Sequence, residues 1–203
     1  MSRPLLITDC DEVLLHMVSH FGDWVREVKG YDFDPEGGDF SNTLKYRDTG
    51  KPLAREDVWP LLDGFFETEM HRQTLVPGAR EALAALSEQA DIVVLTNLSH
   101  HFNAARAIQL SGHGITHRVE TNQGGKGDPV ARLVAEFSPR VTVFVDDLSL
   151  HHSSVAKHAP DVWRLHMIAE PFIAAKTPPA KDAHARIDTW NEALGWIRDR
   201  FQI

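Results

Sequence analysis

Three short apolar runs of this chain each end abruptly in polar or acidic residues. They are residues 4–8 (PLLIT), 91–95 (DIVVL) and 141–145 (VTVFV). The runs are continuous rather than alternating and rich in β-branched residues, a pattern typical of strands buried on both faces of a parallel sheet. Such a sheet needs helices on both of its faces. This feature restricts the chain to a small number of α/β architectures.

Segments with helical spacing lie between and after these runs. Residues 77–89 (PGAREALAALSEQ) and 128–137 (DPVARLVAEF) each place leucines or valines on one side of a helix, and Asp128 fits an N-cap followed by proline. A short helix at 153–158 and a further strand at 162–168 are also predicted. The alternation of strand and helix predicts an α/β fold with a doubly wound, Rossmann-like parallel sheet.

The stretch from 15 to 75 interrupts this alternation. It has helical spacing at 18–28 and at about 55–70, where the second segment is strongly apolar. A Gly- and Asp-rich stretch around 32–39 separates the two, and we find no clear buried strand. A small helical lobe inserted into the parent sheet is the simplest interpretation.

The predicted core therefore comes from two pieces of the sequence, residues 1–14 and 76–203. Within the second piece, residues 171–181 are rich in Pro, Ala and Lys and fit a surface connector. The apolar residues of 183–201 recur at helical spacing and predict a C-terminal helix packed on the core.

The acidic composition limits the choice of partners. The chain of 203 residues has 21 Lys and Arg against 29 Asp and Glu, a formal charge of −8, which disfavours nucleic acids and anionic membranes. Cys10 is the only cysteine, so no internal disulfide forms, and no signal-peptide pattern or membrane-spanning run is found. We expect a cytoplasmic protein; its oligomeric state is left open. A small anionic substrate is still compatible, because a site can hold a metal ion.

Reactive side chains follow the predicted strands at the point where each strand ends. Carboxyl ends of parallel strands share one edge of a sheet, where ligands bind in such folds. We therefore expect one crevice to collect Asp9, Asp11, Thr96, Asn97, Lys126, Asp146 and Asp147. Crowded carboxylates require a cation, and an all-oxygen ligand set favours Mg²⁺ over zinc.

These segments, in this order, resemble the four motifs of the haloacid dehalogenase (HAD) superfamily. LLITDCDEVL resembles the first motif, a strand followed by D-x-D-x-[TV], and VVLTN resembles the second, a strand ending in Thr or Ser. Lys126 stands where the family has its lysine, and VFVDD resembles the fourth motif, a strand ending in paired acids. The resemblance covers residues 4–14 and 76–168.

The resemblance implies a Mg²⁺-dependent phosphatase that works through an aspartyl-phosphate intermediate. Asp9 would be the nucleophile, and Asp11 would protonate the leaving alcohol and then deprotonate the attacking water. Asp9, the backbone carbonyl of Asp11 and Asp146 would hold Mg²⁺, with Asp147 as a further or alternative ligand.

The remaining motif residues would bind the phosphoryl group. Thr96, helped by the backbone of Asn97, would hydrogen-bond its oxygens, and Lys126 would neutralise the charge of Asp9 and phosphate. In this family dehalogenases lack an acid two residues after the nucleophile. Asp11 therefore favours phosphoryl transfer over dehalogenation.

The inserted lobe corresponds to the family's cap, which closes over the substrate and so favours a small phosphorylated metabolite. The candidates for contact with the substrate are His16, His20, Trp24, Lys45 and Arg47. His151 and His152 follow the fourth motif, so one of them is a further candidate. The sequence does not identify the metabolite.

Two alternative functions stay open. A phosphomutase would carry the same motifs. A phospho-accepting or phosphate-binding regulatory protein without turnover would use similar acids, Thr and Lys, but phospho-receiver proteins place the paired acids first in the chain, unlike the order found here. A zinc enzyme is disfavoured, because the 12 histidines form no HExxH motif and no cluster with cysteine.

Overall fold

A six-stranded parallel sheet forms the centre of the protein, for which the computed structural model describes residues 2–35 and 43–203. The strand order is β5-β4-β1-β6-β7-β8, and all neighbours are parallel. The strands are β1 (Leu5–Thr8), β4 (Asp91–Asn97), β5 (Arg118–Asn122), β6 (Thr142–Asp146), β7 (Trp163–His166) and β8 (Ala185–Arg186). The predicted α/β fold with a doubly wound parallel sheet is confirmed.

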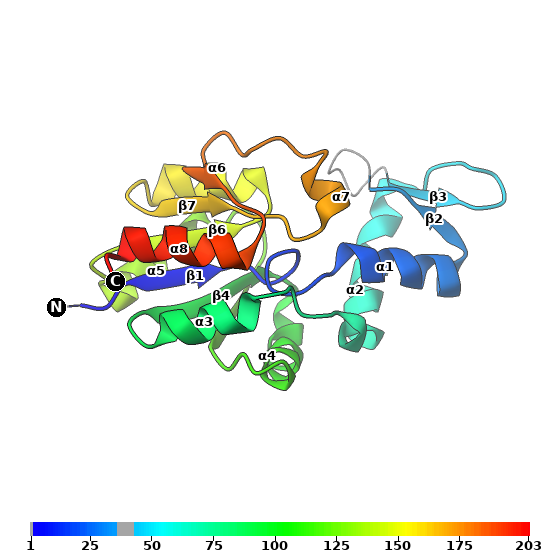
Figure 1. Cartoon of the computed structure of the whole chain (residues 1–203). Coiled ribbons are helices and arrows are strands. Elements are labelled where there is room, and N and C mark those ends of the chain that lie inside the picture. Colours follow the sequence, from blue (N-terminus) through cyan, green and yellow to red (C-terminus); the bar gives the residue numbers. More distant parts are fainter. Residues whose placement is uncertain (1, 36–42) are drawn as a thin grey trace.

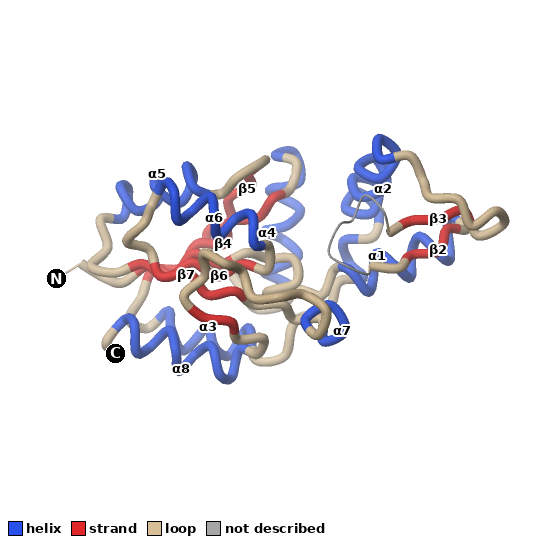
Figure 2. Tube along the Cα trace, turned by 90° about the horizontal axis from the view of Figure 1, so that it is seen from above, coloured by secondary structure: helices blue, strands red, loops and turns tan. Residues whose placement is uncertain are grey.

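Helices cover both faces of this sheet (Figure 2). One face carries α3 (Ala79–Ser87) and α8 (Trp190–Phe201), and the other carries α5 (Gly127–Phe137) and α6 (Ser149–His158). Successive residues of β1 serve opposite faces: Leu6 shares a buried cluster with Leu83 of α3, whereas Ile7 shares one with Val130 of α5. β1 is therefore buried on both sides, as its continuous apolar run predicts. A further helix, α4 (Asn103–Gly112), packs beside β5.

Two helices begin at residues other than the predicted ones. α8 begins at Trp190 rather than near residue 183, because Thr189 is its N-cap and its Oγ1 accepts a hydrogen bond from the backbone N–H of Glu192 at 3.4 Å. The preceding residues form β8 instead. α5 begins at Gly127, one residue before the predicted cap Asp128.

The inserted lobe lies at one end of the sheet (Figure 1) and has its own apolar core. Its two predicted helices are present as α1 (Val18–Trp24), continued by a π-helical segment (Val25–Lys29), and α2 (Arg55–Thr68), followed by a 3₁₀ turn (Met70–Arg72). The lobe also contains an antiparallel hairpin of β2 (Tyr31–Phe33) and β3 (Leu44–Tyr46). The two helices were predicted and the hairpin was not, because strands of three residues are too short to show a period of two. Part of the Gly- and Asp-rich stretch, residues 36–39, lies outside the described residues.

Two chain segments join the lobe to the sheet, and they run side by side. The backbone N–H of His16 donates to the carbonyl of Thr74 at 2.9 Å, and that of Val76 donates to the carbonyl of Leu14 at 2.8 Å. The first of these linkers leaves the sheet directly after β1. The lobe is therefore anchored beside the carboxyl end of the central strand.

The connector after β7 contains a short helix, α7 (Pro171–Ala174), which lies on the side of the core that faces the lobe (Figure 1).

Among the described helices, none combines the length and the apolar composition needed to cross a bilayer.

Candidate active site

The carboxyl ends of β1 and β6 bring three charged side chains into direct contact. Asp9 follows β1, and its backbone N–H donates to the carbonyl of Val145 at 2.8 Å, which fixes it beside Asp146. The ammonium group of Lys126 donates to Asp9 Oδ1 at 2.8 Å and to Asp146 Oδ2 at 2.7 Å. The structure thus places Asp9, Lys126 and Asp146 together, as the sequence predicts.

Lys126 is completely buried and depends on these acids for its charge. Burial alone would lower its pKa, but Asp146 and Asp9 raise the pKa well above the usual range. The close approach of α5 to α6 positions it: the backbone N–H of Gly127 donates to Ser154 Oγ at 2.9 Å. A Cβ at Gly127 would lie 2.3 Å from the backbone oxygen of Ser154, so only glycine permits this packing.

Three acids gather at this edge of the sheet. One carboxylate oxygen from each of Asp9, Asp146 and Asp147 lies within 4.8 Å of the others. Burial raises the pKa of Asp9 to about 7, with Lys126 opposing and Asp146 adding to the effect, and burial together with Asp146 and Asp9 raises the pKa of Asp147 well above its usual range. Since one lysine does not balance three carboxylates, the group has the charge and the oxygen donors that suit Mg²⁺.

The carboxylate of Asp11 belongs to a separate group of polar side chains. Its Oδ1 accepts from Gln73 Nε2 at 2.6 Å, and its Oδ2 accepts from Arg106 Nη2 at 3.0 Å. Arg106 also donates from Nη1 to Gln73 Oε1 at 3.1 Å, which closes a ring of contacts. Gln73 lies in the second linker of the lobe and Arg106 on α4. Our sequence analysis predicted neither residue: it predicted no helix at α4, and it found no motif in the linker that contains Gln73.

Thr96 and Asn97 lie at the end of β4, as expected. Thr96 is 1% exposed, and its Oγ1 has no hydrogen-bond partner within the part of the chain that the structure describes. Asn97 Nδ2 donates to the carbonyl of Gly124 at 2.8 Å, and its Oδ1 accepts from Asn122 Nδ2 at 2.9 Å. Asn97 thereby holds the loop that leads to Lys126, and the hydroxyl of Thr96 is available for a ligand.

The two histidines after the fourth motif contact residues of the candidate site. His152 Nε2 lies 3.0 Å from the backbone oxygen of Asp146, so this nitrogen carries the proton and donates. His151 Nε2 lies 3.3 Å from Asn97 Nδ2, and burial lowers the pKa of His151 to about 4. Burial also lowers the pKa of His152, so both rings are uncharged at neutral pH.

The structure does not bring the five candidate residues of the lobe together. Trp24 is 3% exposed and packs against Phe65, with ring centroids 5.8 Å apart. His20 Nε2 lies 3.0 Å from Thr74 Oγ1, and Arg47 pairs with Asp32 at 3.3 Å. Lys45 is exposed on β3, and His16 lies beside Glu170.

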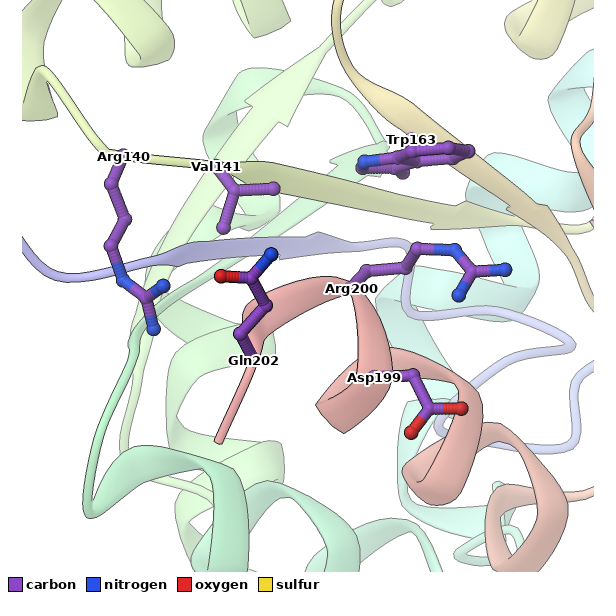
Figure 3. A pocket seen from close by; sticks show the side chains of 6 residues that line it. All are labelled: Arg140, Val141, Trp163, Asp199, Arg200 and Gln202. Atoms are coloured by element: carbon purple, nitrogen blue, oxygen red, sulfur yellow. The ribbon is translucent and has the colours of Figure 1, made fainter.

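A hollow of about 580 Å³ lies at the opposite edge of the sheet. Figure 3 shows its lining by Arg140, Val141, Trp163, Asp199, Arg200 and Gln202. Val141 and Trp163 mark the amino ends of β6 and β7, and the guanidinium of Arg200 covers the ring of Trp163 at 4.9 Å. This hollow is therefore separate from the acids and Lys126 at the carboxyl ends.

Comparison with known proteins identifies relatives in structure but not in sequence. No protein-family model and no curated protein matches the chain. A haloacid dehalogenase-like hydrolase of Streptococcus pneumoniae is 12% identical, with a TM-score of 0.66 over 95% of this chain and 97% of its own.

Two further solved structures match at a similar level. One is a protein of Bacillus subtilis described as a HAD-hydrolase and bound to magnesium (14% identity, TM-score 0.64, 97% of this chain and 99% of its own). The other is a protein of Thermotoga maritima described as a β-phosphoglucomutase (16%, 0.63, 97% and 99%). The four sequence motifs thus stand on a matching architecture, and the chain has the fold of the HAD-like hydrolases.

Proposed function

We propose that this chain is a Mg²⁺-dependent phosphatase of the HAD superfamily that hydrolyses a small phosphate monoester through an aspartyl-phosphate on Asp9. The observation that carries the proposal is the contact of buried Lys126 with both Asp9 and Asp146 at the carboxyl edge of the sheet. The likeness in fold to hydrolases and phosphatases supports it.

The first step transfers the phosphoryl group to Asp9. Asp9 Oδ1 accepts from the backbone N–H of Cys10 at 2.7 Å and from Lys126 at 2.8 Å, which leaves Oδ2 for attack on phosphorus. The new bond joins Oδ2 to phosphorus while the ester bond to the leaving oxygen breaks. Asp11 gives its proton to that oxygen, and the alcohol departs.

The second step releases phosphate. Water attacks phosphorus, the bond between phosphorus and Asp9 breaks, and Asp11 takes the proton of the water. Thr96, the backbone N–H of Asn97 and Lys126 hydrogen-bond the phosphoryl oxygens in both steps, because phosphoryl transfer depends mainly on positioning and electrostatics.

Asp9, the backbone carbonyl of Asp11, and Asp146 would hold the Mg²⁺, with Asp147 as a further or alternative ligand. Bound there, the ion would supply positive charge next to the phosphate oxygens. The all-oxygen donor set and the excess of carboxylates over ammonium groups at this edge support this assignment.

We further propose that residues 15–75 act as a cap and that residues 1–14 and 76–203 act as the catalytic core. Gln73, at the end of the cap, donates to Asp11 at 2.6 Å. Movement of the cap would break this contact and free Oδ1 of Asp11 to reach the leaving oxygen, while Arg106 of the core still holds Oδ2. Acid–base chemistry is in this way coupled to the position of the cap.

A phosphomutase is the second candidate, favoured by the similar fold of the Thermotoga maritima protein described as a β-phosphoglucomutase. A mutase would return the phosphoryl group to another hydroxyl of the same molecule. Analysis of products separates the two, since free inorganic phosphate accumulates only with a phosphatase. A regulatory protein would hold phosphate without turnover.

Hydrolysis of p-nitrophenyl phosphate in the presence of Mg²⁺ tests the proposal. Asp9→Asn removes the nucleophile and should lower kcat at least about a thousandfold while the circular dichroism spectrum is unchanged. Asp91→Asn is the matched control, because Asp91 lies at the opposite end of β4 in an exposed pair with Arg3. Full activity of Asp9→Asn would exclude the covalent mechanism. A screen of sugar phosphates and nucleotides would then identify the substrate.

A further inference from the structure

A second group of potential metal ligands lies outside the candidate active site. One ligand atom from each of Glu12, His16 and Glu170 lies within 4.8 Å of the others. Glu12 and His16 flank the first linker of the lobe, and Glu170 immediately precedes α7. Glu12 and His16 are four residues apart, and the fold brings the distant Glu170 to them where the lobe meets the core.

Glu12 is held in an unusual manner. Its backbone has a φ of 60°, in the left-handed region that non-glycine residues rarely adopt, and its side chain is 3% exposed. Oε1 accepts from the backbone N–H groups of Met17 at 2.8 Å and Val18 at 2.7 Å. Oε2 is buried and has no hydrogen-bond partner among the described residues.

Capping of α1 accounts for Oε1 but not for Oε2. A buried carboxylate oxygen without a partner costs free energy, so a structure that keeps one points to a ligand. His16 Nδ1 and Glu170 Oε1 form an ion pair at 3.2 Å, so Glu12 Oε2 is the atom of this group that lacks a partner among the described residues. Glu170 itself is 8% exposed.

We propose that Glu12, His16 and Glu170 form a second divalent-metal site, selective for a transition-metal ion such as Zn²⁺ over Mg²⁺. Two carboxylates and one imidazole are a donor set that zinc accepts, with water in the remaining position, whereas Mg²⁺ prefers oxygen ligands alone. Ligands of a tetrahedral zinc ion lie about 3.4 Å apart, close to the 3.2 Å already separating His16 Nδ1 from Glu170 Oε1.

An ion at this place would join the first linker to the segment before α7. The backbone N–H of Ala169 already donates to the carbonyl of Glu12 at 2.8 Å, so the two segments are neighbours. The metal would therefore anchor the root of the lobe to the core. Its binding should raise the melting temperature, because it binds the folded chain only.

Calorimetric titration with Zn²⁺ tests the site in protein that has been freed of metal by a chelator and returned to excess Mg²⁺. The excess Mg²⁺ would compete for the acids of the candidate active site, and the wild type should bind one equivalent of Zn²⁺ at the second site. His16→Gln and Glu170→Gln should each weaken this binding at least tenfold. His20→Gln is the matched control, a histidine four residues away that is outside the cluster, and it should bind as the wild type does.

Two outcomes would overturn the proposal: no binding of Zn²⁺ by the wild type, or binding that neither substitution changes. Anomalous scattering at the zinc edge from wild-type crystals tests the site without any variant, and an ion found elsewhere would contradict it. The variant Asp146→Asn distinguishes a failure of this metal site from a failure of the proposed phosphatase function. That variant should lose hydrolysis and keep the equivalent of Zn²⁺.

Discussion

The guanidinium of Arg106 on α4 donates to Asp11 Oδ2 at 3.0 Å, although 95 residues separate the two in sequence. The Arg106 side chain is entirely buried, and that of Asp11 is 15% exposed. Together with Gln73, Arg106 occupies both oxygens of the proposed acid–base residue. The orientation of Asp11 is therefore set jointly by the core and by the linker of the lobe.

Removal of Arg106 should weaken both the fold and the chemistry. Arg106→Met leaves Asp11 without its charged partner in a largely buried place, which typically costs about 3–5 kcal/mol. Urea denaturation should show this loss, and kcat should fall because Asp11 is no longer held. Arg118→Met is the control, since Arg118 pairs with glutamates on the surface. Equal stability of the two variants would refute the assigned importance of the buried pair.

Lys126→Met should lower kcat strongly, whereas substitution of a surface lysine should leave kcat unchanged. Lys126 touches Asp9 and Asp146, and the loss of one preorganised charge at a reacting centre costs about a hundredfold to a thousandfold in kcat. Lys157→Met on α6 serves as the control, because Lys157 is exposed. Steady-state kinetics with saturating Mg²⁺ measure the effect, and wild-type kcat in Lys126→Met would contradict the proposed role.

Thr96→Val separates binding of the phosphoryl group from stability. The Oγ1 of Thr96 has no partner among the described residues, so the substitution breaks no internal hydrogen bond and should leave the free energy of unfolding unchanged or increased. The value of kcat/KM should nevertheless fall about a hundredfold, since one donor to the transition state is lost. Thr142→Val, at the amino end of β6, should not change kcat/KM. If Thr96→Val were less stable and fully active, Thr96 would contribute to the fold and not to binding of the phosphoryl group.

His166 should stay neutral well below the pH at which free histidine is protonated. Its Nδ1 accepts from the backbone N–H of Ala180 at 2.9 Å, and its Nε2 donates to the carbonyl of Asp147 at 2.7 Å. Burial lowers the pKa of His166 to about 4, with the hydrogen bond to Asp147 opposing and Arg186 adding to the effect. Nitrogen NMR of the ring should show the Nε2–H tautomer at pH 5, and a protonated ring at that pH would refute the assignment.

The sign of the pH effect on stability follows from the same shift. The folded-state pKa of about 4 lies below the ordinary value of 6.5, so the unfolded chain binds more protons in that interval. The contribution of His166 is fully present above pH 6.5 and is lost as the pH falls toward 4. Chemical denaturation across this range should give a shallower pH dependence for His166→Gln than for the wild type.

The central strands and the meeting of their carboxyl ends could be predicted from sequence because they are local features. A continuous apolar run defines β1, β4 and β6, and the rules of parallel sheets bring Asp9, Thr96 and Asp146 to one edge. β5, which has no fully buried residue, and β8, with two residues, carry no such run and were not predicted. Short or half-exposed strands lack a local signal.

The group around Asp11 could not be predicted for a different reason. Gln73 and Arg106 lie in segments whose own patterns are unremarkable, and only the tertiary fold brings them to Asp11. The isolated Oε2 of Glu12 is likewise a property of packing.

The most direct test of the account is chemical trapping of the phosphorylated enzyme. The reaction with p-nitrophenyl phosphate is stopped with acid during turnover, the protein is reduced with borohydride, and its peptides are analysed by mass spectrometry. Reduction converts an aspartyl-phosphate to homoserine, and the account predicts homoserine at position 9 of the wild type. Unmodified Asp9 in every peptide of an actively hydrolysing sample would contradict it.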